Sequence, residues 1–101
     1  MAHLDLPFDP SLILVGGAWS PAMSGDTLAL IDPSDTSELA RIARGGAPDI
    51  DRAVTAAHAA RQGDWGRMPA VERGRILTRI GALVRERLDW LAELEARDVG
   101  K

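Results

Sequence analysis

The residue types that most often carry catalysis are scarce in this sequence. It contains no cysteine and only two histidines, His3 and His58. The lack of cysteine excludes a disulfide, a thiolate metal site and a cysteine nucleophile within these 101 residues. His58 lies in an alanine-rich segment without a catalytic partner nearby, and His3 lies in the amino-terminal leader, residues 1–11. We therefore interpret both histidines as non-catalytic.

Two glutamates are close enough in sequence to suggest a pair of carboxylates. Glu93 and Glu95 are separated by one residue in a segment with helical periodicity. Residues two apart on a helix do not face each other, so this spacing does not favour an acid–base pair.

Glycine pairs and arginines could suggest phosphate binding. Gly16-Gly17 and Gly45-Gly46 both lack the G-x-G-x-x-G spacing that holds a pyrophosphate between a strand and a helix, and we interpret both as turns. The arginines of residues 73–87 are interspersed with Glu72 and Glu86, which indicates a solvated, ion-paired helix face.

Composition excludes several classes of protein. An apolar fraction of 46% with 27% charged residues is typical of a folded domain, and 101 residues allow one domain at most. A net charge of −3 provides no basic surface for nucleic acid or an anionic membrane. No apolar run could span a bilayer, and the amino terminus does not resemble a secretory signal. We expect a cytoplasmic protein.

The first half of the chain predicts short strands. Residues 12–15 (LILV) are bounded by glycines, and residues 27–31 (TLALI) end at Asp32-Pro33. Pro33 has no N–H for a strand ladder and favours an extended Asp32, so the strand must end there. Residues 39–43 predict a third short strand. These strands would form an antiparallel hairpin or meander, which is marginally stable alone.

The second half predicts three helices. The first covers residues 48–62, with Pro48 at its start and Gly63 at its end, and residues 63–68 form a loop. The second covers residues 69–88, and the third follows Asp89, a potential N-cap, and ends before Gly100. The fold class is therefore α+β, with a leader arm at 1–11, strands within 12–44 and helices within 47–101.

The second helix has a wide apolar stripe. Its members are Ile76, Leu77, Ile80, Leu83, Val84 and Leu88. The predicted hairpin is too small to cover both this stripe and the first helix. We expect an exposed apolar patch larger than a typical monomer presents.

Seven short segments are informative through their order and spacing. They are residues 16–19 (GGAW, like "INGEW"), 31–35 (IDPSD, like "VNPATGE"), 49–54 (DIDRAV, like "DVDAAV"), 56–60 (AAHAA, like "AARAAF"), Trp65, 72–77 (ERGRIL, like "ERARIL") and 93–101 (ELEARDVGK, like "LETLDTGKP"). Together they resemble, in the same order and register, motifs of NAD(P)-dependent aldehyde dehydrogenases. The resemblance covers roughly residues 12–101.

The resemblance implies that the chain is the amino-terminal part of a Rossmann-like cofactor-binding domain, cut within a family motif. The parent would be a homodimer or homotetramer that oxidises an aldehyde to a carboxylic acid with NAD or NADP. A cysteine would form a thiohemiacetal, which is oxidised to a thioester and hydrolysed. The catalytic and cofactor-binding residues would all lie in later sequence, so this chain alone is expected to be inactive. The alternative is a non-catalytic helical interaction module derived from the family.

The same resemblance implies a site for a sodium or potassium ion. The family's ligands correspond to the backbone carbonyls of Leu30 and Ile31 and to the carboxylate of Asp98. Oxygen ligands of this kind suit a hard cation, and carbonyls facing a carboxylate are all acceptors that would repel one another without it. The alternative is that Asp98 only caps the hairpin end or forms an ordinary ion pair.

Overall fold

The computed structural model describes residues 4–101, so Met1, Ala2 and the predicted non-catalytic His3 lie outside the described part. Four strands come first: β1 (Ile13–Val15), β2 (Ala18–Ser20), β3 (Thr27–Ile31) and β4 (Glu38–Ala43). Four helices follow: α1 (Ala47–Gln62), α2 (Asp64–Arg67), α3 (Ala70–Glu86) and α4 (Leu88–Val99). The predicted α+β class and the order of strands before helices are confirmed.

The strands form two separate antiparallel hairpins, β1–β2 and β3–β4. Gly16 and Gly17 make the β1–β2 turn with φ values of 61° and 79°, a left-handed conformation that tight two-residue hairpins require. The prediction that this glycine pair forms a turn is confirmed. The strands were expected in one hairpin or meander. They divide into two because residues 21–26, which contain Pro21 and Gly25, separate β2 from β3.

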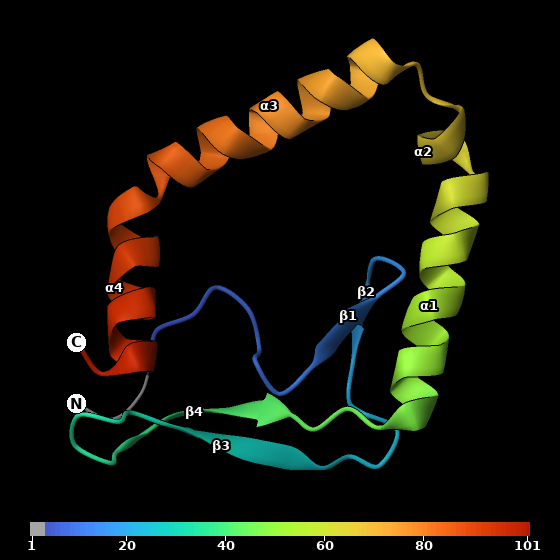
Figure 1. Ribbon diagram of the computed structural model, residues 1–101. Helices are drawn as coiled ribbons and strands as arrows, with labels where there is room; N and C mark the ends of the chain where they lie inside the picture. The colour runs from blue at the N-terminus through green and yellow to red at the C-terminus, as the bar shows by residue number, and fades with distance from the viewer. Residues whose placement is uncertain (1–3) are drawn as a thin grey trace.

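The leader contacts the outer edge of β4 at two points and arches away from the strand between them (Figure 1). The N–H of Leu4 donates to the carbonyl of Leu39 at 3.0 Å, and the N–H of Ala43 donates to the carbonyl of Pro10 at 3.2 Å. Between these two points the ring of Phe8 stacks on that of Trp19 in β2, with centroids 5.6 Å apart. The leader therefore links both hairpins.

The buried core is small. Among residues 4–101, the buried apolar side chains are Leu39, Ala40 and Ala22, and only Leu39 has no exposed surface. Two of these three residues, Leu39 and Ala40, belong to β4, the strand that the leader contacts. The large apolar residues of α1 do not add to this core, since Ile50 is 62% exposed and Val54 is 50% exposed.

The helices follow their sequence signals at most ends. Pro48 lies in the first turn of α1, and Gly100 ends α4 with φ of 81°, as predicted. The segment 63–68, expected to be a loop, contains the single-turn helix α2. A Cβ at Gly66 would overlap the Arg61 carbonyl, so only glycine allows this close turn. Asp89 is not the N-cap of α4: Arg87 takes that position, and Asp89 lies in the first turn.

The helices and the β3–β4 hairpin form the sides of an open frame around the β1–β2 hairpin (Figure 1). The radius of gyration is 16.8 Å, against about 13 Å for a compact domain of about 100 residues. Most of the apolar stripe predicted on the second helix is exposed, as expected: Ile76 (40%), Leu77 (60%), Ile80 (51%) and Val84 (46%) in α3, and Leu88 (59%). The second helix ends at Glu86 and not at residue 88, so Leu88 begins α4. Within residues 4–101, no helix has the length and hydrophobicity needed to cross a membrane.

Candidate functional site

The most connected polar group in the described chain is the carboxylate of Asp49, in the first turn of α1. Only 4% of this residue is exposed. One oxygen, Oδ2, accepts from the N–H of Gly46 at 2.9 Å. The other, Oδ1, accepts from the N–H of Met23 at 3.0 Å and from the Arg52 guanidinium at 2.9 Å. Asp49 therefore joins three segments: the β2–β3 connection, the β4–α1 connection and α1 itself.

These donors stabilise the ionised form of Asp49. The Gly46 N–H makes the largest contribution to lowering the pKa of the carboxyl, burial opposes it, and Arg52 and the Met23 N–H lower the pKa further. A buried carboxylate is costly without partners, so its three donors explain why it remains charged here.

The arrangement decides whether the Gly45-Gly46 turn could hold a dinucleotide. The turn does connect a strand, β4, to a helix, α1, which is the topology of a phosphate-binding loop. The Asp49 carboxylate, however, already accepts from the Gly46 N–H at the start of α1. A phosphate at this turn could not bind that N–H and would be repelled by the negative charge of Asp49. These residues do not fit a pyrophosphate, in agreement with the turn predicted from sequence.

The three predicted cation ligands lie at the ends of two neighbouring elements, β3 and α4. Leu30 and Ile31 are the last residues of β3, where the pairing with β4 shifts register, and Asp98 is exposed on the last turn of α4. A Cβ at Gly100 would lie 3.2 Å from the Cβ of Pro33, so the end of α4 contacts the turn after β3. The structure thus brings the two ends together, and cation binding by Leu30, Ile31 and Asp98 stays a prediction.

The other titratable residues considered from sequence do not assemble a site. His58 and Glu95 are exposed on α1 and α4, and Glu93 is exposed as well. Among residues 4–101, no three histidine, aspartate or glutamate side chains are placed to hold a metal ion. The ion-paired face expected on the second helix is present at Glu72, which pairs with Arg75.

A recurring turn motif was missed in the sequence. Three aspartates each accept, through Oδ1, both the N–H and the hydroxyl of the serine two residues later: Asp9 with Ser11, Asp32 with Ser34, and Asp35 with Ser37. The serine hydroxyl, followed by its N–H, lowers the pKa of Asp9 and of Asp35. The spacing D-x-S is the signal that could have identified these turns.

The family comparison matches residues 19–101 to the model of the aldehyde dehydrogenase family. A candidate aldehyde dehydrogenase from Burkholderia cenocepacia is 46% identical, with 83% of this chain covered and a TM-score of 0.81. HpcC from Thermus thermophilus is 41% identical over 91% of the chain, with a TM-score of 0.84. The NAD⁺ complex of a Bacillus cereus aldehyde dehydrogenase is 30% identical over 89%, with a TM-score of 0.83. This chain spans 18% of the length of each.

Proposed function

The chain belongs to the aldehyde dehydrogenase family, and on this premise we propose that it is part of an enzyme that oxidises an aldehyde to a carboxylic acid with NAD or NADP. Within that enzyme it forms the amino-terminal part of the Rossmann-like cofactor-binding domain. The observation that carries the proposal is the match to the family model over residues 19–101. The NAD⁺ complex of the similar Bacillus cereus enzyme supports the cofactor class.

The role of these residues in such an enzyme is structural. The chain has no cysteine, so the nucleophile that attacks the aldehyde must come from other sequence. The start of α1, where a strand meets a helix through two glycines, is occupied by Asp49 and does not suit a dinucleotide. What the chain offers instead is the apolar face of α3, which suits packing against further elements of the domain.

We also propose that the carbonyls of Leu30 and Ile31 and the carboxylate of Asp98 bind a sodium or potassium ion in the complete enzyme. The contact between Gly100 and Pro33 supports this proposal, because it places the end of α4 beside the end of β3. The complete enzyme is proposed to be cytoplasmic and a homodimer or homotetramer.

A chimera tests the main proposal. Residues 12–101 would replace the corresponding segment of the Bacillus cereus aldehyde dehydrogenase, and aldehyde-dependent reduction of NAD would be measured. We expect a folded, active chimera, and the unmodified 101-residue chain should give no reduction above background. A chimera that does not fold, together with sharp monomeric unfolding and no dye binding by the chain alone, would instead support a non-catalytic interaction module.

The cation proposal has a separate test in the same chimera. The melting temperature would be compared in potassium, sodium and a bulky organic cation at equal ionic strength. The small cations should stabilise the chimera, and Asp98→Ala should remove most of that stabilisation. Equal melting temperatures in all three salts would disprove the site. Glu95→Ala is a matched control, because Glu95 is also an exposed acid near the end of α4.

A further inference from the structure

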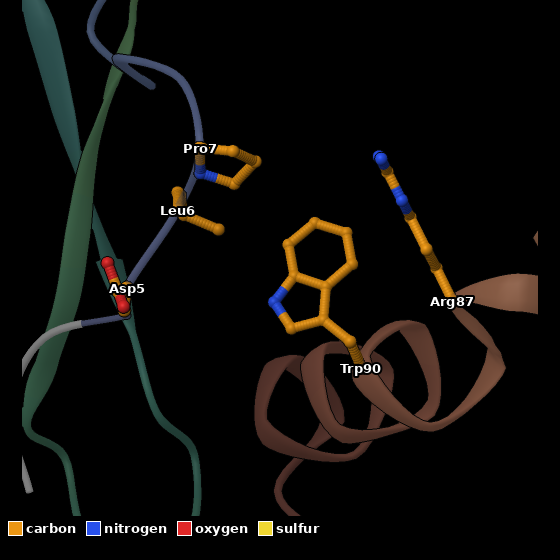
Figure 2. A pocket seen from close by; sticks show the side chains of 5 residues that line it. All are labelled: Asp5, Leu6, Pro7, Arg87 and Trp90. Atoms are coloured by element: carbon orange, nitrogen blue, oxygen red, sulfur yellow. The ribbon is translucent and has the colours of Figure 1, made fainter.

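An open cavity at the surface, with a volume of about 380 Å³, lies between the leader and the start of α4. Its walls are Asp5, Leu6 and Pro7 from the leader, and Arg87 and Trp90 from the other end of the chain (Figure 2). Pockets that hold small molecules have volumes of about 300–1,000 Å³ and combine apolar walls with few polar groups. This cavity has that composition, and it shares no residue with the Asp49 cluster or with the predicted cation ligands.

The polar groups of the cavity lie on opposite sides of an aromatic ring. Figure 2 shows the Trp90 indole standing between the leader and the Arg87 side chain, which extends alongside it. The Asp5 carboxylate lies on the leader side of the indole, and the Pro7 ring is turned toward the space between the leader and Arg87. The walls therefore present the Arg87 donors, the Trp90 ring with its N–H on the leader side, and the Asp5 acceptor in sequence.

The guanidinium of Arg87 is available for a ligand. Within residues 4–101 it forms no ion pair, whereas Arg41, Arg52, Arg67 and Arg75 each pair with a carboxylate. A guanidinium stays charged at all ordinary pH values, and its planar fork matches a carboxylate or phosphate through two parallel hydrogen bonds. The cavity is thus suited to an anion at its Arg87 side and unsuited to a cation there.

We propose that this cavity binds a small, flat molecule with an anionic group at one end and a hydrogen-bond donor at the other, of the aminobenzoate type. The anion pairs with the Arg87 guanidinium, and the ring packs between Trp90 and Pro7. The donor binds the Asp5 carboxylate, which when ionised can only accept. A purely apolar ligand fits less well, because it would remove water from Arg87 and Asp5 without replacing the lost hydrogen bonds.

The three tryptophans allow the site to be tested with an internal control. The full chain would be labelled with fluorotryptophan, and the fluorine NMR signals of Trp19, Trp65 and Trp90 would be assigned by single Trp→Phe variants. Para-aminobenzoate would then be titrated in. The Trp90 signal should shift and saturate at low-millimolar ligand, while the Trp19 and Trp65 signals stay in place, because neither residue lines the cavity.

Variants and related ligands identify the contacts. Arg87→Gln should weaken binding by about tenfold, since it removes a charge-assisted pair. The affinity of Arg87→Lys should lie between those of the unmodified chain and Arg87→Gln, because lysine keeps the charge and loses the planar fork. Arg85→Gln is the matched control, because Arg85 is an arginine of α3 that does not line this cavity. Benzoate should bind more weakly than para-aminobenzoate, and Asp5→Asn should reduce that difference.

Three results would overturn the proposal. They are a Trp90 signal that does not move, equal movement of all three tryptophan signals, and equal binding by the Arg87→Gln and Arg85→Gln variants. The Trp19 and Trp65 signals also report whether each variant keeps the fold, so a loss of binding with unchanged Trp19 and Trp65 positions is a loss of the site itself.

Discussion

The carboxylate of Asp49 accepts a hydrogen bond from the backbone N–H of Met23 at 3.0 Å, although 26 positions separate the two residues. Met23 belongs to the connection between the two hairpins, and Asp49 belongs to the first turn of α1. One side chain therefore fixes the direction in which α1 leaves the strands.

Replacing Asp49 with alanine should destabilise the chain. The change leaves the N–H groups of Gly46 and Met23 and the Arg52 guanidinium without their acceptor. We expect a melting temperature lower by about 5 °C or more, the scale of losing a helix cap in a domain of this size. Circular dichroism at 222 nm would measure it, with exposed Asp51→Ala as the control. An equal effect of the two changes would contradict the assignment.

The stability of the chain should fall in acid because of the same residue. The folded-state pKa of Asp49 lies below the ordinary value of 3.8, so its stabilising contribution is complete above about 3.8 and is lost as pH falls through the lower folded-state pKa. Urea unfolding midpoints measured from roughly pH 6 to pH 2 would show this loss. Asp49→Asn should flatten the curve in that window, whereas Asp64→Asn, at a fully exposed side chain, should not.

Two glycine substitutions should have opposite effects. In α3, a Cβ at Gly74 would meet no atom within 4 Å, so Gly74→Ala should stabilise the chain by about 1 kcal/mol through helix propensity alone. At Gly66, the added Cβ would overlap the Arg61 carbonyl, so Gly66→Ala should open the turn between α1 and α2. Thermal unfolding of both variants tests the pair, and a stabilised Gly66→Ala variant would refute the described turn.

Thr36 is the one non-glycine residue among residues 4–101 with positive φ, at 64°. A β-branched side chain is unfavourable in this conformation, and asparagine tolerates it far better. Thr36→Asn should therefore stabilise the β3–β4 hairpin by up to about 1 kcal/mol. Denaturant midpoints would measure the gain, with Thr55→Asn in α1 expected to destabilise slightly by helix propensity.

The sequence predicts the elements of this fold better than their connections. Prolines and glycines mark the ends of β3, α1 and α4, and apolar spacing identifies α3, because these signals act over a few residues. The contact of Asp49 with Met23 was not foreseen, since no local rule connects residues so far apart. The division into two hairpins also escaped prediction, because it depends on how residues 21–26 turn in space.

The cavity beside Trp90 could not be predicted for the same reason. It forms only where the leader and α4, from opposite ends of the chain, come together. In the sequence, Arg87 was one of the arginines interpreted as a solvated, ion-paired helix face. The D-x-S turns differ, because their signal is short and local and could have been read directly from the sequence.

The leader also determines how this chain meets other chains. An uncovered strand edge is a template on which further strands can add, which leads to aggregation. Here the hydrogen bonds from Leu4 to Leu39 and from Ala43 to Pro10 occupy two points on the outer edge of β4. The leader contains Pro7 and Pro10, whose nitrogens carry no hydrogen and cannot extend a ladder. Edge-to-edge association on that side is therefore hindered at both ends of β4.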